Sequence, residues 1–390
     1  MRVVFFASAF PSAAETGIDM VHVRRARALA RHASVVAVVP TPWAPRPLAA
    51  LSARWDAYAR LGSVAHLDGI PVVRPRYLQV PHSGALAGIT MALGTLGCIR
   101  ELRARGACDV LFAQGIVPDG LAAVLLGRWT GVPVACLGRG SDVHGLAKSM
   151  LARSLAAFTL DRAAAVAVVA RQLARTLAGV SHGRPIAILP NGIDLDRFVP
   201  GDRTAARARL DIEPSSRVVL YVGRLVAGKG IEELLEAFAE VLATTPDAGL
   251  AIVGAGPLRV TLERQARTLG LADRVHFAGE VAHDLIPTWM QACDVLTLPS
   301  AAEGFPNVIR EALACGRPVV ATPVGDVPRL VTPDVGRLVP VGDPSALAAA
   351  LGAALRIAWE PAAIRRHVAG MTWEQNAEAT HHFLEAAVCA

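Results

Sequence analysis

The stretch VVLYVGRLVAGKGIEELLEAFAEVL, residues 218–242, indicates the fold class of this chain. Its first five residues, Val218–Val222, are apolar and mostly valine, which predicts a buried β-strand. From Ile231 to Leu242 the apolar residues recur at a helical spacing, which predicts an amphipathic helix. A glycine-rich turn over residues 223–230 joins the two elements. Strand, tight turn and helix in this order form the repeating unit of a parallel α/β sheet.

The same alternation extends through both halves of the chain. Buried strands are expected in the first half at Val3–Ala7, Ser34–Val39, Asp109–Gln114, Pro133–Leu137, Ala165–Val169 and Ile186–Leu189, and in the second half at Val218–Val222, Leu250–Val253, Val275–Phe277, Val295–Leu298, Pro318–Ala321 and Leu338–Val339. We therefore predict an α/β chain of two doubly wound, Rossmann-like domains that face each other across a cleft. The expected boundaries are 1–195, 196–370 and a final helix, 371–390, that packs back on the first domain.

Composition excludes several other classes of protein. The chain has 390 residues, of which 53% are hydrophobic and 18% charged, so it is neither disordered nor fibrous. No run of about 18 apolar residues is present, so no membrane-spanning helix is expected. The apolar start, Val3–Phe10, favours a first strand over a signal peptide. Six cysteines without paired spacing predict reduced thiols rather than disulfides or a zinc site.

Charge is divided unevenly between the two halves. Residues 1–195 carry a net charge of +11 and residues 196–390 a net charge of −5. A basic domain can meet anionic lipid, nucleic acid or a phosphate-bearing substrate. Nucleic acid is the weakest of these, because no binding motif is present and few aromatic residues lie among the arginines.

Two stretches interrupt the alternation, residues 40–62 and residues 74–99. One interpretation is a pair of amphipathic helices that cover the sheet. The other is an interfacial surface on anionic lipid, with Arg46, Arg54 and Arg60 as its basic contacts. Both interpretations stay open from the sequence.

The turn at 223–230 carries the first candidate site residues. Arg224 and Lys229 lie where a strand ends and a helix begins, and backbone N–H groups and the helix dipole favour a diphosphate there. Only two of the 39 basic residues are lysines, Lys148 and Lys229. A lysine at this turn suggests that a compact point charge is needed. A solvated surface turn is the alternative.

The segment PSAAEGFPNVIRE, residues 299–311, is the second candidate. Glu303 falls in the loop after strand Val295–Leu298, and Glu311 about one turn into the next helix. Free N–H groups at the helix start suit a phosphate, and carboxylates suit the hydroxyl groups of a sugar. Alternatively, Glu303 is an ordinary loop residue and Glu311 complements the helix dipole.

Together these motifs resemble the family 4 glycosyltransferases, which have the GT-B fold. The resemblance covers nearly the whole chain. Its further pieces are Val253–Pro257, Val275–Gly279, Ala292–Val295, Glu311–Ala321, Val324–Pro328 and the Pro190-Asn191-Gly192-Ile193-Asp194 segment. Gly254-x-Gly256 alone could belong to a dinucleotide fingerprint, but the third glycine is missing at the required spacing.

The resemblance implies roles for individual residues. Arg224 and Lys229 would neutralise the diphosphate of a nucleotide-sugar donor, Glu303 would hold the transferred sugar, and Glu311 the ribose. The base would lie near Gly279 to Val281. The remaining donor-binding positions implied are Gly17, Gly223, Gly254, Gly304, Phe305, Pro306, Asn307 and Val308.

One segment departs from the family pattern. Many relatives have a His-Gly-x-Asp segment after the strand at 133–137, and this chain has Arg139-Gly140-Ser141-Asp142 followed by Val143 and His144. This version resembles the teichuronic-acid-biosynthesis subgroup. Arg139 stays protonated, so it would hold a carboxylate or phosphate rather than act as a base. Arg139 and Asp142 are candidate catalytic residues, and His144 is a possible substitute for the missing histidine.

The resemblance implies a retaining glycosyltransferase without a metal or other cofactor. The expected donor is a UDP-sugar, and the expected acceptor is a glycan or a polyprenyl-diphosphate-linked saccharide in cell-surface polysaccharide biosynthesis, joined by an α-linkage. The expected location is the cytoplasm, with peripheral contact to the inner face of the plasma membrane. A nucleotide-sugar epimerase, a GDP-mannose-using transferase and a lipid-associated structural protein are the alternatives.

Overall fold

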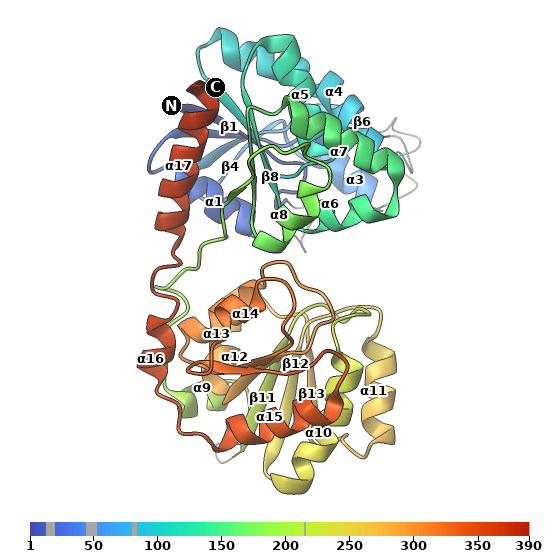
Figure 1. The fold of residues 1–390 in the computed structure, drawn as a ribbon, viewed down its shortest axis with the longest axis vertical. Coiled ribbons are helices and arrows are strands. Elements are labelled where there is room, and N and C mark those ends of the chain that lie inside the picture. Colours follow the sequence, from blue (N-terminus) through green and yellow to red (C-terminus); the bar gives the residue numbers. More distant parts are fainter. Residues whose placement is uncertain (13–19, 44–52, 80–83, 214–215, 390) are drawn as a thin grey trace. The chain divides into compact units, whose positions relative to one another are not determined.

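The computed structural model describes residues 1–12, 20–43, 53–79, 84–213 and 216–389 (Figure 1). The chain divides into two compact units. Unit 1 comprises Met1–Gly192 and Trp373–Ala390, and unit 2 comprises Ile193–Thr372. These divisions fall within three residues of the boundaries expected at 195 and 370. Helix α17 (Trp373–Cys389) contacts α1 (Val21–Leu29), so the end of the chain belongs to unit 1.

Unit 1 is built on an eight-stranded sheet in the order β10-β9-β8-β7-β1-β2-β5-β4. Its strands are β1 (Arg2–Phe6), β2 (Ser34–Val38), β4 (Val64–Leu67), β5 (Ile70–Val73), β7 (Val110–Ala113), β8 (Val134–Gly138), β9 (Ala165–Val168) and β10 (Ala187–Ile188). All neighbouring strands are parallel except β4 and β5. The side chains of Val3 to Phe6 are fully buried, which is typical of a sheet with helices on both faces.

Helices of unit 1 connect these strands. They are α1, α3 (Ala53–Arg60), α4 (Ala87–Ala104), α5 (Asp119–Thr130), α6 (Ser141–His144), α7 (Met150–Arg162), α8 (Arg171–Ala178) and α17, with 3-10 helices η1 (Gly84–Leu86) and η2 (Gly145–Lys148). From β1 the chain passes to β2 on one side, and it later returns to β7 on the other side. The topological switch point of unit 1 therefore lies between β1 and β7.

The stretches at 40–62 and 74–99 are not simply two helices. They contain α3 and α4, but also β3 (Thr41–Trp43) and β6 (Arg76–Leu78), which pair with each other. Between them lies the β4–β5 hairpin, whose turn residues Asp68 and Gly69 have φ of 49° and 80°. An Asp-Gly pair between two short apolar runs is typical of such a turn, so the sequence contained a signal for the hairpin.

Unit 2 has a six-stranded parallel sheet in the order β13-β12-β11-β14-β15-β16. Its strands are β11 (Arg217–Val222), β12 (Ala248–Val253), β13 (Val275–Gly279), β14 (Val295–Leu298), β15 (Val319–Ala321) and β16 (Gly336–Leu338). Its helices are α9 (Arg203–Arg209), α10 (Ile231–Thr244), α11 (Arg259–Thr268), η3 (His283–Leu285), α12 (Ile286–Ala292), α13 (Asn307–Ala314), α14 (Val327–Leu330), α15 (Pro344–Arg356) and α16 (Pro361–Arg366). The predicted α/β class and the two Rossmann-like domains are confirmed.

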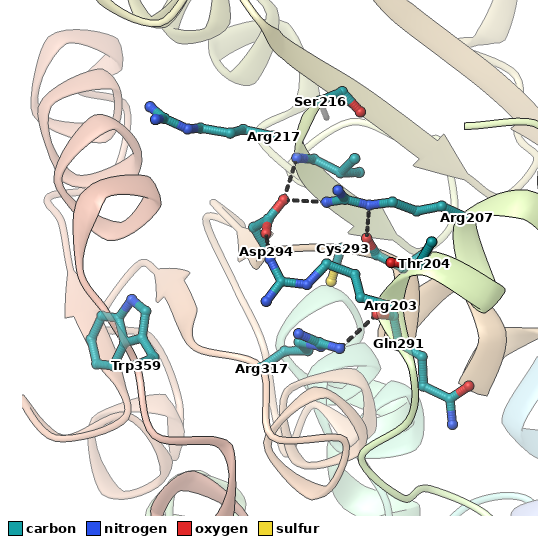
Figure 2. Close-up of polar contacts among 12 residues, drawn as sticks. Arg203, Thr204, Arg207, Ser216, Arg217, Gln291, Cys293, Asp294, Arg317 and Trp359 are labelled. Atoms are coloured by element: carbon teal, nitrogen blue, oxygen red, sulfur yellow. Dashed lines mark hydrogen bonds and ion pairs between the residues drawn. The ribbon is translucent and has the colours of Figure 1, made fainter. Parts of the chain in front are cut away.

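A network of arginines fastens the amino end of the unit 2 sheet (Figure 2). Asp294, just before β14, accepts hydrogen bonds at Oδ2 from the Val218 N–H and from Arg207 Nη2, each at 2.7 Å. Its Oδ1 pairs with Arg203. Arg207 is 5% exposed and also donates from Nε to the Ala292 carbonyl at 3.0 Å. Asp294 thereby ties α9 to β11 and β14, which gives this residue a structural role.

Candidate donor site at the unit 2 switch point

Two loops meet at the carboxyl end of the unit 2 sheet. Strands β11 and β14 are neighbours, yet β11 leads outward to β12 while β14 leads outward to β15 on the other side. Residues 223–230 follow β11 and residues 299–306 follow β14, so both loops leave the sheet at its topological switch point. In open parallel sheets this is the position where ligands bind.

Close backbone packing holds the two loops together. The Ala301 N–H donates to the Gly228 carbonyl at 2.9 Å. Gly230, with φ of 69°, opens α10 in the left-handed conformation, and a Cβ there would collide with the Pro299 carbonyl oxygen. Only glycine fits both the conformation and the space.

Lys229 and Glu303 form an ion pair across these loops. Lys229 Nζ lies 2.6 Å from Glu303 Oε1, and the two side chains are 25% and 13% exposed. Ser300 Oγ donates to the same oxygen at 2.7 Å. Glu303 Oε2 makes no hydrogen bond to any residue that the structure describes. The pair thus fixes the ammonium group while one carboxylate oxygen remains available to a hydroxyl group.

Arg224 lies in the first of the two loops and is exposed. Its carbonyl oxygen accepts a hydrogen bond from the Tyr221 hydroxyl at 3.2 Å. Burial raises the pKa of Tyr221 well above its ordinary value, so this hydroxyl stays a donor. The arrangement holds the backbone of Arg224 while its guanidinium group extends from the loop.

The second sequence motif forms the loop and the first turns of α13. Asn307 begins the helix after Pro306, as the sequence indicated, and Glu311 lies half-buried one turn further along. Arg310, which sequence reasoning missed, is 1% exposed. Its Nη2 donates to Asn307 Oδ1 at 2.6 Å. Its guanidinium carbon lies 4.3 Å from the centre of the Phe305 ring.

Arg310 therefore supports the predicted donor-binding residues Phe305 and Asn307 from beneath. Burial lowers its pKa to about 10, and the guanidinium remains charged at neutral pH. The predicted positions Gly304 and Val308 are half-buried beside it.

The remaining predicted glycines lie on neighbouring strand ends. The Gly223 N–H donates to the Val253 carbonyl at 3.0 Å, and the Gly254 N–H to the Gly279 carbonyl at 2.8 Å. Gly254, with φ of 142°, packs so closely on the Gly223 carbonyl that no side chain would fit. The structure thus brings Gly223, Gly254 and Gly279 into one row, with Val281 two residues beyond its end.

Unit 1 places Arg139 and Asp142 at the carboxyl end of β8. Asp142 accepts the N–H groups of Arg139 at 3.0 Å, Gly140 at 2.9 Å and Ile116 at 2.8 Å. Both of its carboxylate oxygens are used in this way, so Asp142 shapes the loop. The predicted positions Gly17 and His144 cannot be placed, because Gly17 and the side chain of His144 lie outside the described residues.

Arg139 is held by His22, which sequence reasoning missed. Arg139 Nη1 hydrogen-bonds His22 Nε2. Burial lowers the pKa of His22 well below its ordinary value, and the positive charges of Arg139 and Arg25 lower it further. The imidazole is therefore neutral, and its Nε2 accepts the hydrogen bond from the guanidinium. The signal available in the sequence was a polar ring one turn before Arg25, on the face of α1 that also carries Ala26 and Leu29.

Asp119 is a second titratable group that sequence reasoning missed. It is 5% exposed, and its Oδ2 accepts the Ser8 N–H at 3.0 Å. Burial raises its pKa to about 6, against the smaller opposite effect of the Ser8 hydrogen bond. An aspartate at the start of an apolar helix, α5, was the signal available.

The described residues contain no group of three His, Cys, Asp or Glu side chains that could hold a metal ion. Within the same residues, no helix has the length and apolar character needed to cross a bilayer. All six cysteines are free.

Two family models match the chain. The model described as Glycosyltransferase Family 4 matches residues 17–197, and the model described as Glycosyl transferases group 1 matches residues 216–356. The chain is 29% identical over 338 residues to the teichuronic acid biosynthesis glycosyltransferase TuaC of Bacillus subtilis, covering 85% of this chain and 83% of TuaC. It is 40% identical over 208 residues to a D-inositol 3-phosphate glycosyltransferase of Geodermatophilus obscurus, covering 50% of this chain and 46% of the relative. The match thus spans about half the length of that relative.

Solved structures share the fold. Sucrose-phosphate synthase from Thermosynechococcus elongatus has a TM-score of 0.75 at 22% identity, covering 100% of this chain and 97% of that one. Anabaena HepE in complex with UDP has a TM-score of 0.70 at 22% identity, covering 99% and 97%. With both domain types matched in order along the chain, the protein belongs to the family 4 glycosyltransferases and has the GT-B fold.

Proposed function

We propose that this chain transfers a sugar from a nucleoside diphosphate donor, a UDP-sugar, to a glycan or lipid-linked saccharide of a cell-surface polysaccharide. The observation that carries the proposal is the Lys229–Glu303 pair at the switch point, with Arg224 exposed in the same loop. Cations suit the diphosphate, and a carboxylate suits the hydroxyl groups of the sugar. In the donor, a single bond joins the sugar ring to the diphosphate. Their partners must therefore be neighbours, as Lys229 and Glu303 are.

Each residue then has a task in the reaction. The bond between the anomeric carbon and the diphosphate oxygen breaks, and a bond from that carbon to the acceptor oxygen forms. Lys229 and Arg224 stabilise the negative charge that develops on the leaving diphosphate. Glu303 Oε2 holds a sugar hydroxyl, and Glu311 holds the ribose.

We further propose retention of configuration, giving an α-linkage, without a metal ion. The acceptor proton passes to the leaving phosphate oxygen on the same face, because no enzymic nucleophile is assigned. Two cations, Lys229 and Arg224, supply the charge that a metal would otherwise provide. The name of the relative TuaC supports a polysaccharide acceptor, and the UDP in the HepE structure supports the base.

Arg139 is proposed to hold an anionic group of a substrate, a carboxylate or a phosphate. Neutral His22 and the loop shaped by Asp142 fix its position. A planar guanidinium binds such groups with two parallel hydrogen bonds, which lysine cannot imitate. Arg139→Lys should therefore raise the KM of the anionic substrate nearly as much as Arg139→Gln does.

A panel of nucleotide sugars tests the proposal. Release of the nucleoside diphosphate is measured for UDP-glucose, UDP-N-acetylglucosamine, UDP-glucuronate and GDP-mannose, with and without a saccharide acceptor. The proposal expects acceptor-dependent release of UDP. Release of UDP with an isomerised free sugar would indicate the epimerase. A preference for GDP-mannose would show that the donor base is guanine rather than uracil. No release from any donor would contradict the proposal.

Contact with an anionic membrane is also proposed, and the structure describes only one of the three arginine side chains that the sequence suggested for it. Arg46 and the side chain of Arg54 lie outside the described residues. Arg60 pairs with Asp56 at 2.6 Å on the exposed face of α3. Another surface of unit 1 fits a membrane better.

A further inference from the structure

Helix α4 is apolar on two opposite faces. One face, which includes Met91, Ala92 and Ile99, is buried in unit 1. The other face is exposed, although it carries Leu86, Ile89 and Leu93, which are 41%, 40% and 61% exposed. An apolar helix of a soluble domain normally exposes polar residues on its outer side. The exposed apolar face of α4 therefore needs a partner.

The exposed residues form a continuous stripe. Positions 86, 89 and 93 are spaced by three and four residues, so they share one side of the helix, and Arg100 continues the same side two turns later. Arg100 is exposed. The stripe therefore changes from apolar to basic along α4.

Helix α7 adds a second exposed apolar group on the same side of unit 1. It contacts η1, which leads directly into α4. In its first turn Met150 is 87% exposed and Leu151 is 52% exposed. Arg153 follows and is also exposed. Three large apolar side chains of α4–η1 and two of α7 thus remain in water, each group followed by an arginine.

The charges around the stripe favour an anionic partner. Residues 84–100 and 149–160 contain no Asp or Glu, and the half of the chain that holds them has a net charge of +11. Apolar side chains with flanking arginines and no acidic residues are typical of a surface that lies in a membrane interface. A second copy of this chain would bring arginines against arginines, which is unfavourable.

We propose that the exposed face of η1–α4 together with the first turn of α7 inserts into the headgroup region of an anionic bilayer. Leu86, Ile89, Leu93, Met150 and Leu151 enter the interface, and Arg100 and Arg153 bind lipid phosphates. This surface deepens the membrane contact in the proposed function by naming the residues responsible. It does not depend on the donor chemistry, because lipid binding is measured without any turnover.

Co-sedimentation with vesicles tests the proposal. The full chain is mixed with vesicles of phosphatidylcholine alone, or of phosphatidylcholine with phosphatidylglycerol. The triple variant Ile89→Gln, Leu93→Gln, Met150→Gln should lose about ten-fold or more of its partitioning onto anionic vesicles, because each leucine-sized group withdrawn from water contributes roughly that factor. Glutamine is a good helix former, so α4 and α7 should persist, and circular dichroism checks this.

Two further variants sharpen the test. Val64→Gln is the matched control, because Val64 is 62% exposed on β4 of the same unit, outside the proposed surface. It should bind vesicles as the unchanged chain does. Arg100→Gln with Arg153→Gln should lose about ten-fold on anionic vesicles and nothing on neutral ones.

The proposal is overturned if the unchanged chain binds neither vesicle, or if the folded triple variant binds as well as the Val64 control. It is also overturned if the three substitutions leave vesicle binding unchanged and instead separate a dimer of the chain into monomers. That result would identify a second copy as the partner. Because binding is the readout, either result leaves the test of UDP release unaffected.

Discussion

The two ends of the unit 2 sheet both set carboxylates against cations, but they use them differently. At the amino end, Asp294 gives both oxygens to protein donors, the Val218 N–H and the guanidinium groups of Arg203 and Arg207. At the carboxyl end, Glu303 uses Oε1 on Lys229 and Ser300, and its Oε2 makes no hydrogen bond to any of the described residues. A carboxylate whose oxygens are all occupied holds the fold together, whereas one that keeps an oxygen available beside a cation can bind a substrate.

The largest effect is expected at the amino end. Asp294→Ala leaves the buried guanidinium of Arg207 without its carboxylate, and the free energy of unfolding should fall by about 3–5 kcal/mol. Urea unfolding measures this change. Asp247→Ala is the control, because Asp247 pairs with Arg217 at 3.5 Å with both side chains nearly half exposed. Its removal should cost less than about 1 kcal/mol. Equal losses in the two variants would contradict the structural role of Asp294.

Asp119 of unit 1 is a third carboxylate to compare with Asp294 and Glu303. It differs from both, because no ion pair to it is found among the described residues. Its pKa in the folded chain, about 6, lies above its ordinary value of 3.8, so the folded chain holds this proton more tightly than the unfolded chain. Stability should therefore fall by about 3 kcal/mol as the pH rises from about 4 to about 6, and stay level above that. Asp119→Asn keeps an oxygen for the Ser8 N–H and should lose this slope. An identical slope in the variant would show that another group is responsible.

At the carboxyl end the expected loss is in turnover. Lys229→Ala and Arg224→Ala should each lower kcat by about 100-fold or more, since each removes a charge that matters most as the diphosphate departs. The free energy of unfolding should change by less than about 1 kcal/mol in Arg224→Ala, because that side chain is exposed. It should fall further in Lys229→Ala, which leaves the largely buried Glu303 without its cation, so kcat is compared at a temperature where both variants are folded. Arg264→Ala, which removes an exposed cation from α11, is the control and should keep its kcat. Unchanged turnover in both loop variants would refute the assigned roles.

Glu303 and Glu311 separate two kinds of contact. Glu303→Gln should lower kcat by about ten-fold, because its contact with the sugar strengthens as positive charge develops there. Glu311→Ala should raise the donor KM by about ten-fold with little change in kcat, because the ribose does not change during the reaction. Steady-state kinetics with varied donor distinguish the two. A pure KM effect in both variants would remove Glu303 from the reacting centre.

The smallest expected effect is that of metal removal. Activity should stay within about two-fold when EDTA is added, because Lys229 and Arg224 carry the charge of the leaving group. Loss of activity that Mg²⁺ or Mn²⁺ restores would show that the two cations do not suffice.

Local patterns in the sequence predicted most of the fold. The buried parallel strands were predicted because they are continuous apolar runs, and α10 was predicted because its apolar stripe is regular. The β4–β5 hairpin was missed because its exposed residues break the apolar pattern, although Asp68-Gly69 marked its turn. The loop positions of Lys229 and Glu303 were also predicted, because each loop comes directly after a predicted strand.

Contacts between distant residues were not predictable in this way. Lys229 and Glu303 are 74 residues apart in the sequence, and they can pair because β11 and β14 are neighbours in the sheet. No local pattern in the sequence predicts that these two strands are neighbours. The support of Arg139 by His22, 117 residues away, depends likewise on tertiary packing. Arg310 is close in sequence to Phe305 and Asn307, but its burial in α13 was not predictable from the local pattern. These residues have ordinary sequence surroundings, and only their burial reveals their function as supports.

Binding of UDP and UMP tests the central claim most directly, because it needs no acceptor. Calorimetry with the unchanged chain should show UDP binding at least about ten-fold more tightly than UMP, since the second phosphate meets Arg224 and Lys229. The difference should disappear in Arg224→Ala and Lys229→Ala and persist in Arg264→Ala. Equal affinity for UDP and UMP in the unchanged chain, or a difference that survives both loop variants, would contradict the claim that the unit 2 switch point binds the donor diphosphate.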